Sequence, residues 1–84
     1  MKKPKVTPKS HSAKNNDYEA VLSAIAANVR RLRKDKGWSQ EDLANFAEID
    51  RTYVGYVENA KNNVSLRTLC KIARAFDLDV QELL

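Results

Sequence analysis

One short pattern occurs four times between Trp38 and the end of the sequence. An apolar residue is followed by Ser or Asp, and a second apolar residue stands four positions after that polar residue. Ser and Asp are favoured helix N-caps because their side-chain oxygens accept hydrogen bonds from free backbone amides, and the flanking apolar pair forms a hydrophobic staple. The four caps, Ser39, Asp50, Ser65 and Asp79, predict helices over residues 40–47, 51–59, 66–76 and 80–84.

A longer helix is predicted before these four. Apolar residues recur at i, i+3, i+4 and i+7, which is the spacing of one buried helix face. Gly37 favours a helix end because glycine readily adopts the left-handed conformation that follows a last helical turn. The sequence thus predicts a helix over about residues 17–36 and an all-α fold of five helices. Its predicted buried face consists of Tyr18, Val21, Leu22, Ile25, Val29 and Leu32.

Length and composition limit the chain to one small domain. Eighty-four residues leave no room for a second core, and one cysteine with one histidine provides neither an intrachain disulfide nor a zinc-ligand cluster. Cys70 is expected to be a small buried residue rather than a redox switch. No apolar run approaches the ~20 residues that span a bilayer, so a cytoplasmic protein is expected. Neither a metal nor a cofactor is expected.

The net charge of +4 lies entirely in the N-terminal segment. Residues 1–17 carry five lysines and one aspartate, whereas residues 18–84 carry ten basic and ten acidic groups. With two prolines and one large aliphatic residue, residues 1–17 are predicted to be a disordered tail before a domain at 18–84. The tail is either a leader without function or a basic arm that adds non-specific affinity for phosphates.

The second and third predicted helices are separated by only three residues, which indicates a tight turn between two steeply crossing helices. Ala44 allows the close crossing, Ile49 fills the turn, and Val54 and Val57 supply the inner face of the third helix. With these positions, the segment WSQEDLANFAEIDRTYVGYVENAKNNVSL resembles the lambda-repressor-like helix-turn-helix family (Cro/C1-type, XRE), which includes phage repressors. Its run DRTYVGYVE is most similar to the controller proteins of restriction-modification systems.

The resemblance implies that residues 51–59 form the recognition helix, which enters the major groove of DNA. The guanidinium of Arg51 matches the O6/N7 acceptor pair of guanine, and Thr52 can contact a base acceptor or a thymine methyl. Other polar residues near the helix ends are expected to contact phosphates. The predicted DNA-binding residues are Gln40, Arg51, Thr52, Tyr53, Tyr56, Asn59, Lys61, Asn62 and Asn63. For Tyr53 and Tyr56 the alternative is partial burial in support of the fold.

Several other positions receive structural interpretations. Arg33 and Glu58 resemble the family's half-buried ion pair between the first and third helices, and Trp38 is expected in the core rather than in a ligand site. Glu48 and Ala60 stand where many family members have glycine. If Glu48 is left-handed, it costs about 1 to 2 kcal/mol. Val64 replaces a common proline, so the loop geometry differs from the family pattern.

The C-terminal segment is unusually apolar and predicts a homodimer. The fourth predicted helix offers Leu66, Leu69, Ile72, Ala73 and Phe76 as a core face. The apolar residues that follow exceed what a terminal helix needs, so a self-complementary two-fold interface is predicted. The alternative is that all of them cover the chain's own core. The residues concerned are Phe76, Leu78, Val80, Leu83 and Leu84.

The function expected from these features is that of a transcriptional regulator. A homodimer would bind double-stranded DNA at a palindromic operator, as a repressor or as a controller that also recruits RNA polymerase. A protein-interaction partner of the same fold, such as an antitoxin or anti-repressor, is the alternative. An enzyme is not expected, because the carboxylate pairs Glu41/Asp42 and Asp77/Asp79 lie at helix starts, where capping explains them.

Overall fold

The computed structural model describes residues 9–61 and 64–84, with only the backbone for residues 9–16. In this part of the chain, all the regular structure is helical. The elements are α1 (Lys9–Asp35), α2 (Gln40–Ala47), α3 (Arg51–Glu58), α4 (Leu66–Ala75) and a 3-10 turn, η1 (Val80–Leu83). The prediction of an all-α helix-turn-helix fold is therefore confirmed.

The helix count and the first boundary differ from prediction. The fifth predicted helix is only the single turn η1, because four residues close i→i+3 bonds such as the one from the Leu84 amide to the Gln81 carbonyl (3.1 Å). The helix predicted from residue 17 begins at Lys9, so residues 9–16 are helical rather than disordered. Extending an existing helix costs far less than nucleating one. Residues 1–8 lie outside the described residues.

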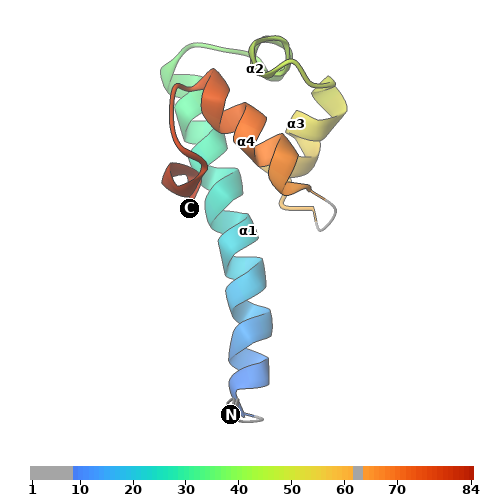
Figure 1. Cartoon of the computed structure of the whole chain (residues 1–84), viewed down its shortest axis with the longest axis vertical. Coiled ribbons are helices and arrows are strands. Elements are labelled where there is room, and N and C mark those ends of the chain that lie inside the picture. Colours follow the sequence, from blue (N-terminus) through green and yellow to red (C-terminus); the bar gives the residue numbers. More distant parts are fainter. Residues whose placement is uncertain (1–8, 62–63) are drawn as a thin grey trace.

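The helices pack around one core formed by all five elements. α2 packs against α3 and α4, α1 packs against α3 and η1, and α4 packs against η1. The N-terminal half of α1 extends away from this bundle (Figure 1). Leu43, Ala44, Ala47, Val54 and Val57 are buried, as the sequence predicted. The core also contains Ile25, Val29, Ile72, Ala73, Phe76 and Leu83.

Four predictions of burial were wrong. Tyr18 and Val21 on α1 are 52% and 44% exposed, because this part of the helix extends past the elements that could cover it. Leu66 is 68% exposed at the start of α4, and Cys70 is exposed one turn later on the same helix. Leu66 is the first residue of α4, whereas the buried residues of this helix, Ile72 and Ala73, lie near its other end.

Local interactions fix the helix ends. Gly37 is left-handed (φ 73°) after α1, as predicted, and the Trp38 amide donates to the Arg33 carbonyl at 3.0 Å. Ser39, Asp50 and Ser65 each accept a backbone hydrogen bond at the start of α2, α3 and α4. At the start of η1 the hydrogen bond runs the other way: the Asp79 backbone amide donates to the Glu82 carboxylate at 3.0 Å. The predicted capping pattern thus places three of the four α-helices.

Candidate DNA-binding surface

The turn between α2 and α3 determines how α3 is presented. Glu48 is left-handed (φ 60°, ψ 46°), and the Ile49 amide donates to the Ala44 carbonyl at 3.0 Å. Ile49 is half-buried and packs against the core, so it fills the turn as predicted. Ala44 is only 3% exposed, and its small side chain allows the two helices to cross closely. The two helices are thus held in the geometry of a helix-turn-helix.

A buried ion pair fixes α3 against the rest of the molecule. Glu58 is 3% exposed, and Arg33 Nε donates to its Oε2 at 2.7 Å while Arg33 Nη2 donates to its Oε1 at 3.1 Å. The hydrogen bonds from Arg33 to Glu58 raise the pKa of the guanidinium, so the arginine stays charged. Arg33 Nη1 also donates to the Trp38 carbonyl at 2.8 Å. The predicted pair between the first and third helices is confirmed.

Gln40 takes part in this network rather than standing free on the surface. Its Nε2 donates to Glu58 Oε1 at 3.0 Å, which ties α2 to α3. Ser39 and Asp42 close the capping box beside it, with the Asp42 amide donating to Ser39 Oγ at 3.0 Å. The first turn of α2 is acidic, and its negative charge disfavours a bound phosphate there. A contact from Gln40 to DNA stays a prediction.

The first turn of α3 carries three predicted DNA-binding side chains into solvent. Arg51, Thr52 and Tyr53 are all exposed, and Tyr53 is 49% exposed. Asp50 caps this turn, since the Thr52 amide donates to its Oδ1 at 2.8 Å. That hydrogen bond, the Thr52 side chain and the charge of Arg51 lower the pKa of Asp50. Arg51 forms no ion pair among the described residues, so its guanidinium can meet a ligand.

The two tyrosines of α3 lie together. Their rings meet edge to face with centroids 6.0 Å apart, and Tyr56 is half-buried. Asp50, Thr52, Tyr53 and Tyr56 line a surface hollow of about 480 Å³. Gly55 has no neighbour within 4 Å of the place where a Cβ would stand, so the backbone is open on this side. This face of α3 is therefore polar, aromatic and accessible.

The segment after α3 contains residues that were predicted to contact DNA phosphates. Ala60 is left-handed (φ 56°), and the Lys61 amide donates to the Tyr56 carbonyl at 3.0 Å. The side chains of Asn59 and Lys61 are exposed. Asn62 and Asn63, which the sequence also predicted as DNA contacts, lie outside the described residues.

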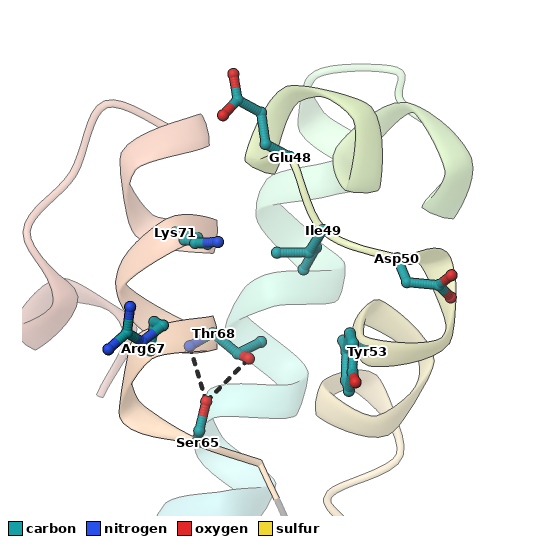
Figure 2. A pocket seen from close by; sticks show the side chains of 8 residues that line it. All are labelled: Glu48, Ile49, Asp50, Tyr53, Ser65, Arg67, Thr68 and Lys71. Carbon is teal, nitrogen blue, oxygen red and sulfur yellow. Dashed lines mark hydrogen bonds between the residues drawn. The ribbon is translucent and has the colours of Figure 1, made fainter.

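Two basic residues beside α3 were missed by the sequence reasoning. Arg67 and Lys71 project from successive turns of α4 and line a groove of about 530 Å³ with Tyr53 and Ser65 (Figure 2). The groove also contains Glu48, Ile49, Asp50 and Thr68. The i, i+4 spacing of Arg67 and Lys71 was visible in the sequence, but only the packing of α2 against both α3 and α4 brings them near Tyr53.

The predicted dimer residues divide into two sets. Phe76 and Leu83 are 5% and 0% exposed within the chain itself, which favours the alternative that they cover its own core. Leu78 and Val80 are half-buried, whereas Leu84 is 64% exposed.

Trp38 packs against the core, as expected. Its ring stacks on Phe76 with centroids 5.5 Å apart and on Phe46 with centroids 4.4 Å apart.

Neither a metal site nor a membrane span is evident in the part of the chain that the structure describes. No group of three or more His, Cys, Asp or Glu side chains gathers there in a way that could hold a metal ion. None of the helices within residues 9–61 and 64–84 combines the length and the apolar character that crossing a bilayer requires.

The crossed helices, the fixed third helix and its accessible first turn define a helix-turn-helix protein. The sequence profile of the helix-turn-helix family matches residues 29–83, and the chain belongs to this family. Control protein C.SmaI from Serratia marcescens is 43% identical over 64 residues, which cover 76% of this chain and 76% of that protein. A Neisseria meningitidis hypothetical transcription factor is 40% identical over 68 residues, which cover 81% of this chain but only 64% of the relative.

Solved structures of controller proteins show the same fold. The restriction-modification controller protein C.AhdI from Aeromonas hydrophila has a TM-score of 0.70 and 45% identity, and the match covers 77% of this chain and 98% of that one. The controller protein C.Esp1396I, solved as a tetramer with its natural 35 base-pair operator, has a TM-score of 0.66 and 28% identity. That match covers 75% of this chain and 83% of C.Esp1396I.

Proposed function

We propose that this protein is a transcriptional regulator that binds a palindromic DNA operator as a homodimer and controls restriction-modification genes. The observation that carries the proposal is the first turn of α3, where Arg51, Thr52 and Tyr53 are exposed on a helix fixed by the Glu58 network. Its relatives C.SmaI and C.AhdI are control proteins, and C.Esp1396I binds an operator.

The surface suits two kinds of contact. Arg51 can donate two hydrogen bonds to a guanine in the major groove, which gives sequence preference. Lys61, Asn59 and the basic pair Arg67 and Lys71 lie on segments that flank α3, where they can contact phosphates and position the helix. Tyr53 lines the same groove as Arg67 and Lys71 and can pack on a thymine methyl or donate to a phosphate.

The test is operator selection from random duplexes, followed by titration of selected and scrambled duplexes at two salt concentrations. Arg51→Ala is expected to weaken binding to the selected duplex by about 1 to 3 kcal/mol and to relax one base preference. Lys61→Ala should weaken binding to both duplexes alike and lower the salt slope by about one unit. Arg74→Ala, which removes an exposed arginine from the other end of α4, is the matched control.

Two results would contradict the proposal. Equal affinity of the wild-type protein for selected and scrambled duplexes would remove sequence-specific operator binding. An Arg51→Ala variant indistinguishable from Arg74→Ala would favour a protein-interaction role for the same fold. A restriction endonuclease or methyltransferase gene beside this one is expected if restriction-modification genes are the target. The position of the operator relative to the promoter would then decide between repression and recruitment of RNA polymerase.

A further inference from the structure

The extended part of α1 carries an apolar face that the described residues leave largely exposed. Asp17, Ala20, Val21 and Ala24 line a hollow of about 420 Å³ together with Leu84, which follows η1. Val21 is 44% exposed and Leu84 is 64% exposed. Exposed apolar residues that are contiguous commonly mark an interface.

This face continues along the helix toward the bundle. Residues three and four apart lie on the same side of a helix, so the stripe runs from Asp17 through Ala20 and Ala24 to Ala27 and Arg31. All five of these residues are exposed. Three of them are alanines, whose short side chains allow a second helix to approach closely.

The charges of the stripe are arranged to complement a second copy of the same helix. Asp17 and Arg31 lie seven residues to either side of Ala24. When two such helices pack antiparallel with Ala24 at the crossing point, the Asp17 carboxylate of each copy faces Arg31 of the other. Such a two-fold arrangement uses the same patch on both subunits.

Arg31 is available for this contact. Within the chain it approaches Asp35 at 3.9 Å and Asn28 Oδ1 at 3.5 Å, and the side chains of Arg31 and Asp35 are 61% and 69% exposed. Exposed pairs at such distances contribute little and exchange easily for a better-placed partner. Leu84 is held close to the stripe because Asn28 Nδ2 donates to the Leu83 carbonyl at 2.8 Å.

We propose that this face of α1 is a homodimer interface in which two copies pack antiparallel across Ala24, with Leu84 of each copy against the other helix. The inference rests on the proposed function, in which the operator is bound by a dimer. It differs from the interface predicted at Phe76, Leu78, Val80 and Leu83, because the side chains of Phe76 and Leu83 are already buried within their own chain.

The first test is a charge-reversal cycle on the full chain, with the dimer dissociation constant measured by analytical ultracentrifugation. Asp17→Arg and Arg31→Asp should each weaken dimerisation on the order of tenfold, since each places like charges opposite one another twice in the dimer. The double variant restores opposite charges and should return to within about threefold of the wild type. Arg74→Asp, on α4, is the matched control and should leave the constant unchanged.

The second test locates the crossing point. Cys70→Ser first removes the native exposed cysteine, and Ala24→Cys or Glu19→Cys is then introduced. A short bis-maleimide should crosslink the Ala24→Cys protein into dimers. Glu19→Cys, which is also exposed but lies on a different side of the helix, should remain largely uncrosslinked.

The outcomes separate this inference from the proposed function. A monomeric wild-type chain, a double reversal no better than its parents, or equal crosslinking at the two positions overturns the interface on α1. Loss of the dimer in Leu78→Asp with unchanged affinity in Asp17→Arg would assign the interface to the α4 and η1 surface instead. None of these results changes the selectivity expected of Arg51, which is measured separately with the selected and scrambled duplexes.

Discussion

Glu58 is the only polar or charged residue that is buried in the described part of the chain. Its carboxylate is buried and accepts hydrogen bonds from Arg33 and Gln40, and Arg30 donates to its backbone carbonyl. A buried carboxylate is tolerated only when such partners offset its lost hydration. The resemblance implied the pair with Arg33. The contribution of Gln40 was not predicted, because it depends on how α2 crosses α3.

Removing one partner of this pair should be severe. Arg33→Met leaves the Glu58 carboxylate buried without its charged partner and is expected to lower the free energy of unfolding by about 3 to 5 kcal/mol. Urea denaturation followed by circular dichroism measures this loss. Arg33→Met combined with Glu58→Leu should recover most of it, and Arg74→Met, at an exposed site, should change stability by less than about 0.5 kcal/mol. A tolerated single substitution would show that Glu58 is not held in a buried pair.

Glu48 carries backbone strain at the turn of the DNA-binding motif. A left-handed residue other than glycine costs about 1 to 2 kcal/mol, and glycine avoids this cost at some expense in chain entropy. Glu48→Gly should therefore raise the free energy of unfolding by up to about 1 kcal/mol. Glu48→Ala removes the same side chain but keeps the strain, so it serves as the control. Equal stability of the two variants would mean that the backbone at this position is not strained.

At the scale of the helices, the caps explain why the chain divides where it does. Three predicted N-caps accept the expected hydrogen bonds, and the fourth begins only a 3-10 turn. Short helices of eight residues are unstable in isolation, so they depend on caps and on packing of their apolar faces. The caps therefore set the starts of α2, α3 and α4, and the packing keeps them folded.

The stabilisation that the Asp50 cap gives to α3 should depend on pH. The Thr52 amide hydrogen bond, with the Thr52 side chain and the charge of Arg51, holds the pKa of Asp50 below its ordinary value of about 4. A lowered pKa in the folded state means that the ionised cap stabilises the protein fully above about pH 4. This stabilisation is lost as the pH falls through the lowered pKa.

Asp50→Asn tests this dependence, since asparagine caps a helix without titrating. Urea midpoints of the wild type and the variant should differ by a constant amount between about pH 5 and pH 7. Below about pH 4 the wild type should lose stability relative to Asp50→Asn. Parallel curves over the whole range would show that the Asp50 carboxylate does not contribute as an ionised cap.

For the whole molecule, the position of charge matters more than its total. The net charge of +4 lies before residue 18, and residues 18–84 are neutral. Within that neutral part, Arg51, Arg67 and Lys71 lie on or beside α3 with two carboxylates, Glu48 and Asp50. Three carboxylates, Asp77, Asp79 and Glu82, lie near η1 with one arginine, Arg74. This asymmetry favours DNA binding at α3 and disfavours it at the opposite end.

Deletion of residues 1–8 should separate the two roles considered for the N-terminal charge. This segment carries three lysines. If they contact phosphates, the deletion lowers affinity for a scrambled duplex and reduces the salt slope, while the ratio of selected to scrambled affinity is kept. An unchanged salt slope would indicate a leader that does not contact DNA. Replacing Lys2, Lys3 and Lys5 by serine tests the charge without shortening the chain.

The sequence by itself determined where α2, α3 and α4 begin, the helix-turn-helix spacing and which polar side chains the first turn of α3 exposes. These features depend on neighbours within a few positions, through caps, apolar spacing and exposed polar side chains. The tertiary structure decided what those patterns could not: that Phe76 and Leu83 are buried in their own core, that Arg67 and Lys71 lie beside Tyr53, and that part of α1 is uncovered. Burial depends on which distant helix lies against a residue, and helical periodicity marks an apolar face without identifying what covers it.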